Sequence, residues 1–257
     1  MTQPREEWTL DTQRLGRRVL VFDDLPSTND YAARLAHDPA NDGLAILADR
    51  QTAGRGQHGR TWTALPRSSV LLSLLLFPPD PLRRPAILTA WAAVAVCRTV
   101  QRFIGIPARI KWPNDVLVRG KKVCGILIEQ GRGTIVGIGL NVRQTAADFA
   151  AAELPLAASL SQFAPSVPDT SEVARELLRQ LDEGFAPLLD GDLTLLESCW
   201  KWHLGLLGRS VTAECHDAVI HGRLRDLTFA GVELTRTGQP PLSLVPEKVL
   251  HLSRREG

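Results

Sequence analysis

The chain has 257 residues, of which 44% are hydrophobic, and 30 lysines and arginines face 28 aspartates and glutamates. This length suits one large domain with a small one, and the hydrophobic content argues against a disordered chain. The formal net charge of only +2 argues against a dedicated nucleic-acid binder, which carries a larger or more clustered basic excess. The N-terminal segment has no apolar signal core, and the longest apolar run, 70–77, is too short to cross a bilayer. We therefore expect a cytoplasmic protein with neither a nucleic acid nor a membrane as partner.

Short apolar runs bounded by turn residues predict strands, in chain order, at 17–22, 43–49, 69–77, 108–112, 122–129 and 134–141. Ser27 and Asp30 have capping-box spacing and predict a short helix that runs to about Ala36. The clearest helix is 85–104, since Pro85 can occupy its first turn and Gly105 can end it. Further helices are predicted near 171–189 and 193–206, and the Ala-, Pro- and Ser-rich stretch 145–171 is predicted to be a surface connection.

The pattern changes after Gly208. From 209 to 252 the chain consists of short, alternating apolar runs punctuated by glycines, which predicts four or five strands of a small SH3-like β-barrel. The boundary is placed near Leu207, so that the predicted domains are 1–207 and 208–257. The predicted fold class is α+β, with a mixed β-sheet domain, flanking helices and a small C-terminal barrel.

The four cysteines show no CxxC spacing, and reduced thiols are expected: Cys97, Cys124, Cys199 and Cys215. Two of them lie near histidines, but the spacing matches no standard zinc pattern. We therefore assign no metal ligand.

The loop from Gly54 to Trp62 reads GRGQHGRTW. It fits the dinucleotide pattern GxGxxG, and also the P-loop pattern if Arg60 replaces lysine. Both patterns require a helix directly after the glycines, whereas here Pro66 would break one and a strand follows. What remains are glycines that permit close approach to a ligand, and two arginines suited to phosphate or carboxylate. The alternative is a solvated surface loop.

Five segments occur in one order along the first 141 residues: STN (27–29), QTA leading into the loop (51–62), KWPND (111–115), KVCGILIE (122–129) and GIGLN (137–141). Together they resemble the biotin–protein ligase family, in its monofunctional type without an N-terminal DNA-binding domain. KWPND and the loop are the most specific of them. The resemblance implies an enzyme that activates biotin with ATP and Mg²⁺ to biotinyl-5′-AMP. It then transfers biotin to a lysine of a biotin carboxyl carrier protein.

The resemblance also implies roles for particular residues. The expected catalytic residues are Lys122, Asp115 and Arg55: the lysine would reach the ligand carboxylate and the α-phosphate, and the aspartate would orient or deprotonate the incoming amine. The expected biotin-binding residues are Ser27, Thr28, Asn29, Gln51, Arg55, Gly56, Gln57, Lys122 and Gly125. The expected adenylate-binding residues are Arg55, Arg60, Trp62, Lys111, Asn114, Lys122 and Asn141. Taken singly, these positions could equally be a plain helix cap, a surface lysine or turn residues.

One feature of the strands adds to this interpretation, and one feature of the loop departs from the family pattern. Gly125, Gly137 and Gly139 lie inside strand patterns, where either a ligand or tight backbone packing must come close. The family loop more often reads GRGRxGR, with arginine at the position of Gln57. We therefore hypothesise that this protein holds its adenylate less tightly than a relative with arginine there.

Other functions on the same fold were weighed. A lipoate ligase or acyltransferase lacks both the loop and KWPND. A biotin-responsive transcriptional regulator needs a DNA-binding module of about 50 residues or more, whereas about 16 residues precede the first predicted strand. A non-catalytic biotin sensor is disfavoured by Lys122, Asp115 and Arg55 together. The sequence leaves the oligomeric state open, and a homodimer is one state that it allows.

Overall fold

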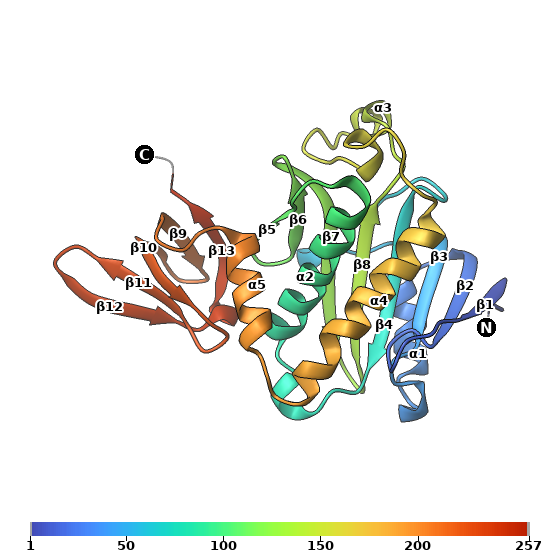
Figure 1. Cartoon of the computed structure of the whole chain (residues 1–257), viewed down its shortest axis with the longest axis horizontal. Coiled ribbons are helices and arrows are strands. Elements are labelled where there is room, and N and C mark those ends of the chain that lie inside the picture. Colours follow the sequence, from blue (N-terminus) through green and yellow to red (C-terminus); the bar gives the residue numbers. More distant parts are fainter. Residues whose placement is uncertain (1, 256–257) are drawn as a thin grey trace.

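The structure, a computed structural model, describes residues 2–255 and contains two sheets (Figure 1). The larger sheet consists of β1 (Glu6–Thr9), β2 (Arg18–Leu25), β3 (Ala45–Gln51), β4 (Ser69–Leu76), β5 (Arg109–Lys111), β6 (Asp115–Val118), β7 (Lys121–Gln130) and β8 (Thr134–Asn141). Its spatial order is β1-β2-β3-β4-β8-β7-β6-β5. Since β2 and β3 run parallel and the other neighbouring pairs are antiparallel, the sheet is mixed.

Helices cover both faces of this sheet. α2 (Pro85–Ile104) and α4 (Thr170–Leu189) pack together over one face (Figure 1), on apolar side chains of β4, β7 and β8. α1 (Thr28–Leu35) packs on the opposite face against β3, β4 and β8. By length and composition α2 could cross a membrane, but 72% of its apolar window is buried inside the fold. It is the central core helix, and it ends at Gly105 in a left-handed conformation as predicted.

A second sheet follows α5 (Thr194–Leu204). It is antiparallel, with the strands β9 (Ser210–Cys215), β10 (Val219–Leu227), β11 (Val232–Arg236), β12 (Gln239–Leu244) and β13 (Val249–Arg254) in the order β12-β11-β10-β9-β13. Aromatic rings join the two parts: Trp200 stacks on Phe229 at 5.0 Å, and the Trp112 indole N–H donates to the Val249 carbonyl at 2.7 Å. The tryptophan of KWPND therefore fastens the large sheet to the small one.

The predicted α+β class is confirmed, and the elements differ from expectation in three places. β1 was not predicted, because Trp8 is its only buried residue and a short polar strand has no alternating pattern. β6 was not among the predicted strands. The stretch 145–171 lies mostly at the surface, as predicted, but it contains α3 (Ala146–Ala151), and residues 158–160 are buried. The apolar residues of this stretch are too widely spaced to form a periodic pattern.

Candidate active site

The site lies on the face of the large sheet that α2 does not cover. Alternate residues of β7 and β8, among them Cys124, Ile126, Val136 and Ile138, belong to the core beneath α2 and α4. Their neighbours therefore face the other side: Gly125, Leu127 and Glu129 on β7, and Gly137 and Gly139 on β8. Register aligns Asp115 with Gly125 and Gly139 in one row across three strands, and Ser73 with Gly137 and Leu127 in the next.

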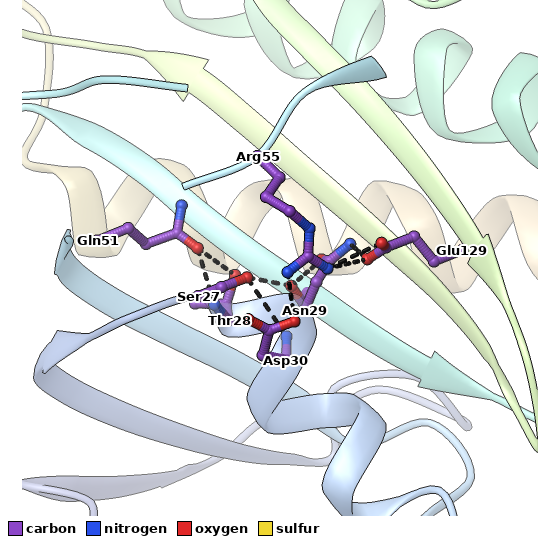
Figure 2. A network of polar contacts seen from close by, with 8 residues as sticks. Ser27, Thr28, Asn29, Asp30, Gln51, Arg55 and Glu129 are labelled. Atoms are coloured by element: carbon purple, nitrogen blue, oxygen red, sulfur yellow. Dashed lines mark hydrogen bonds and ion pairs between the residues drawn. The ribbon is translucent and has the colours of Figure 1, made fainter. Parts of the chain in front are cut away.

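Polar side chains at the start of α1 lie over this face (Figure 2). Ser27 caps the helix as predicted, accepting from the Asp30 N–H at 3.3 Å. Gln51 Oε1 accepts from the backbone N–H of Thr28 at 2.7 Å and from its hydroxyl at 3.0 Å. Because the amide oxygen of Gln51 already accepts two hydrogen bonds, its Nε2 group is the part of the side chain that can donate to a ligand.

Asn29 is held at both ends of its amide. Its Nδ2 donates to Glu129 Oε2 at 2.6 Å, and its Oδ1 accepts from the Ser73 hydroxyl at 2.5 Å. Ser73 and Asn29 are buried, with 0% and 5% of their surface exposed, so the bond between them forms away from water and is costly to break.

The strand glycines are explained by the side chains above them. A Cβ atom on Gly137 would lie 2.4 Å from Asn29 Oδ1, and one on Gly139 would lie 2.4 Å from the Trp62 ring. A Cβ atom on Gly125 would lie 2.9 Å from Trp62 and 3.3 Å from Lys122 Nζ. The three glycines thus make room for side chains of the protein itself, whereas the sequence had suggested either a ligand or tight backbone packing.

Lys122 and Asp115 meet over Gly125. Lys122 Nζ lies 2.6 Å from Asp115 Oδ1 and 5.7 Å from the centre of the Trp62 ring. The backbone of Lys122 is also bonded to the segment after α3: its N–H donates to Leu156 at 2.8 Å, and its carbonyl accepts from Ala158 at 2.9 Å. The stretch first read as a surface connection therefore borders the site.

The glycine and arginine loop folds back on itself as a tight hairpin. The Gly56 N–H donates to the Arg60 carbonyl at 2.7 Å, and the Trp62 N–H donates to the Gly54 carbonyl at 3.0 Å. His58 at the tip has φ of 55°, in the left-handed region. A short turn and then β4 follow the loop, so the rejection of the dinucleotide and P-loop patterns is confirmed.

Arg55 points from this loop towards two carboxylates (Figure 2). Its Nη2 lies 2.8 Å from each oxygen of Glu129, and its Nη1 donates to Asp30. The hydrogen bond to Asp30 is the largest cause that raises the pKa of Arg55 above its ordinary value, and Glu129 adds to it. The guanidinium is therefore always charged, and two opposite charges already surround it.

The cavity between these groups is small, about 30 Å³. Its lining includes Ser27, Thr28, Asn29, Gln51, Arg55, Trp62 and the three strand glycines. A space of this size holds about one water molecule, whereas sites for small organic ligands enclose about 300 Å³ or more. A ligand of that size therefore needs some of the lining side chains to move, and Trp62, which lies over Gly125 and Gly139, is the largest of them.

Several residues expected at the adenylate lie outside this cavity. Asn114 Nδ2 donates to the Ile126 carbonyl at 2.8 Å, and buried Asn141 Nδ2 donates to the Ala158 carbonyl at 3.1 Å. Lys111 and Arg60 are exposed and form no ion pair within residues 2–255. Gln57 lies apart from Asn29, in a cleft of about 260 Å³ lined also by Trp112, Trp200 and Val249.

Three residues of the network received no role from the sequence: Asp30, Ser73 and Glu129. Two of them carry a signal that could have been used. Ser73 is a polar residue inside an otherwise apolar strand. Glu129 is four residues beyond Gly125, so it must share a face of the strand with that glycine. Asp30 carries no signal beyond its place in the capping box.

Comparisons with known proteins agree with this geometry. Residues 21–143 match the Biotin/lipoate A/B protein ligase family. The Bifunctional ligase/repressor BirA of Bacillus subtilis is 34% identical over 236 residues, covering 90% of this chain and 73% of the relative. The Biotin--[acetyl-CoA-carboxylase] ligase of Mycobacterium tuberculosis is 38% identical over 190 residues, 70% of each chain.

A solved structure shares the whole arrangement. The biotin protein ligase from Aquifex aeolicus in complex with biotin and ATP superposes with a TM-score of 0.77 at 26% identity, covering 93% of this chain and 99% of that one. The B. subtilis relative exceeds 30% identity and is covered over most of its length. The chain therefore belongs to the Biotin/lipoate A/B protein ligase family.

Proposed function

We propose that this chain is an ATP-dependent biotin–protein ligase, which makes biotinyl-5′-AMP and then transfers biotin to a lysine of a carrier protein. The observation that carries the proposal is that two chemically different groups of side chains lie over the same face of the large sheet, at the two ends of the site. Uncharged polar side chains, among them Asn29 and Gln51, form one end, which we call the neutral end, and Glu129 lies beside it. At the other end Lys122 Nζ lies 2.6 Å from Asp115 Oδ1. Relatives named for this activity, and a solved neighbour that holds biotin and ATP, support it.

The neutral end suits a fused ring that carries N–H donors and a carbonyl acceptor. Gln51 Nε2 can donate, and the Ser27 hydroxyl can donate or accept, whereas the Thr28 hydroxyl already donates to Gln51 Oε1. Because this end is buried, each group left unpaired would carry a desolvation cost, so a ring without matching polar atoms would be rejected. A lipoyl group has no N–H donors on its ring, and we expect it to be a poor substrate.

The charged end suits the acyl phosphate. In the first step a carboxylate oxygen of biotin forms a bond to the α-phosphorus of ATP, and the bond to pyrophosphate breaks. Lys122 can neutralise the charge that gathers on both reacting groups. In the second step a lysine amine forms a bond to the acyl carbon, and AMP leaves with the electron pair of the broken C–O bond. Asp115 can orient that amine and take its proton.

Mg²⁺ is expected to accompany ATP. Within residues 2–255 no group of three or more His, Cys, Asp or Glu side chains converges on one point. The residues present therefore offer no cage for the ion, which would be held mainly by the phosphates themselves. The acceptor is proposed to be a biotin carboxyl carrier protein, as the names of relatives suggest. No observation in the site favours a DNA-binding role.

The decisive experiment is ATP–pyrophosphate exchange by the purified chain, followed with labelled pyrophosphate. Exchange that depends on biotin and is absent with lipoate would support the proposal, as would subsequent biotinylation of a carrier domain. Exchange with lipoate but not with biotin would overturn it.

Replacing Gln57 with arginine tests how tightly the adenylate is held. The added guanidinium would place a permanent charge in the cleft beside Trp112, where it can attract phosphate. We expect slower release of free biotinyl-5′-AMP, by about tenfold, which corresponds to a gain of about 1.4 kcal/mol. Release can be followed by chromatography in the absence of carrier protein.

Gln101→Arg, on an exposed position of α2, is the matched control for added charge and should release adenylate at the original rate. An unchanged rate of biotinyl-5′-AMP release in the Gln57 variant would contradict the hypothesis that this residue weakens binding of the adenylate.

A further inference from the structure

The carboxylate of Glu129 is shared by two segments that are far apart in the chain. Arg55 Nη2, from the loop, lies 2.8 Å from both of its oxygens, and Asn29 Nδ2, from α1, donates to Oε2 at 2.6 Å (Figure 2). Glu129 itself is fixed near the end of β7, an interior strand of the large sheet. It therefore joins the loop, the helix and the sheet at one point.

The carboxylates around Arg55 determine whether this arginine can bind an anionic ligand. One guanidinium faces two carboxylates, Asp30 and Glu129, so this cluster has a net charge of −1. An incoming phosphate or carboxylate would be repelled by that excess. Lys122 differs, because it faces the single carboxylate of Asp115 and leaves its end of the site without a negative excess. The group that binds the anion is thus Lys122, while the guanidinium of Arg55 is already paired with carboxylates of the protein.

Glu129 also orients the ring-binding end. An ionised carboxylate only accepts hydrogen bonds, so it forces Asn29 to present Nδ2 towards it and Oδ1 towards Ser73. If the amide rotated, Oδ1 would face the Glu129 carboxylate, which cannot donate to it, so the bond to Glu129 would be lost. The same contact that anchors the loop therefore fixes the helix residue over which the ligand ring must lie.

We infer that Glu129 is a positioning residue of this ligase. It holds Arg55 as the anchor of the loop 52–62 and Asn29 in its binding orientation, and Arg55 acts through this contact and not as a phosphate ligand. The inference rests on the proposed function. Because the cavity is only about 30 Å³, lining side chains must move before a ligand can enter. On this inference Arg55 leaves Glu129 when biotin enters and returns to it in the closed site. Glu129 thereby sets how long biotin stays bound.

The test compares Glu129→Gln with Arg55→Gln and the double variant, in biotin-dependent ATP–pyrophosphate exchange. Glutamine keeps the size of the side chain but removes its charge and the fixed orientation of Asn29. We expect KM for biotin to rise at least tenfold while kcat stays within threefold, since the loop anchor is lost and Lys122 is untouched. The double variant should be no worse than the more affected single variant, because both residues act through one contact.

Limited trypsin digestion gives a second readout, because Arg60 lies in the loop and precedes Thr61. Cleavage after Arg60 should become at least fivefold faster in Glu129→Gln. Glu129→Asp, which keeps the charge, should recover part of the binding and resist trypsin better than the glutamine variant. Asp24→Asn, which breaks the exposed Arg50–Asp24 pair between β2 and β3, is the matched control and should behave as the unaltered protein.

Three results would overturn the inference: a KM for biotin within twofold of the original, an unchanged cleavage rate after Arg60, or a loss confined to kcat. A greater loss of kcat in Arg55→Gln than in Glu129→Gln would show that Arg55 contacts the reacting phosphate. Absence of biotin-dependent exchange in the unaltered protein is a different result, since it would refute the proposed function itself.

Discussion

Replacing Lys122 with alanine should reduce biotin-dependent ATP–pyrophosphate exchange by about 100-fold or more, the usual effect of losing a group that stabilises a developing negative charge. The substitution has a double effect. It removes the cation over Gly125, and it leaves the Asp115 carboxylate, 2.6 Å from the lost ammonium group, without a counter-charge. That carboxylate would then repel the carboxylate of biotin and the phosphates of ATP.

Lys121→Ala is the matched control, because Lys121 is the preceding residue on β7 and is exposed. It should retain exchange within about twofold of the original rate. Lys122→Arg should retain part of the activity, since a cation remains but with a different shape. If Lys122→Ala exchanged as fast as Lys121→Ala, the assignment of Lys122 to the reacting phosphate would be wrong. Circular dichroism spectra would show that each variant is folded.

Replacing Gly137 with alanine should lower the affinity for biotin by about tenfold or more. The new Cβ atom would lie 2.4 Å from Asn29 Oδ1 and 3.0 Å from both Cγ and Nδ2 of the same amide. Asn29 cannot yield without losing its bonds to Ser73 and Glu129, each worth about 0.5–1.5 kcal/mol. Isothermal titration with biotin measures the effect directly.

Gly131→Ala provides the control on the same hairpin, because a Cβ atom there would have no neighbour within 4 Å. It should bind biotin as the original chain does. Equal affinities for the two alanine variants would mean that Asn29 is not held where the structure places it. The Gly137 variant should also unfold at a lower temperature, because overpacking a buried contact costs about 1–3 kcal/mol.

The sequence predicted most of the large elements, for a local reason. The helix 85–104 carries its own start and stop signals, and the buried runs of β4 and β8 are apolar and bounded by turn residues. β1 and β6 are short, and only pairing with a neighbouring strand makes them strands. The sequence did not show that the stretch 145–171 reaches the site, for the same reason: its backbone bonds to Lys122 involve a residue more than thirty positions away.

The same distinction between local sequence signals and long-range contacts applies to the candidate site. The sequence by itself was enough to propose Ser27–Asn29, the loop and Lys122 as site residues, since they belong to contiguous motifs whose order and spacing indicate their chemistry. Only the tertiary structure decided which groups meet. It placed Lys122 beside Asp115, gave Asn114 and Asn141 backbone contacts of their own, and set Arg55 between Asp30 and Glu129. Glu129 is 74 residues from Arg55, and only the pairing of the strands brings such distant side chains together.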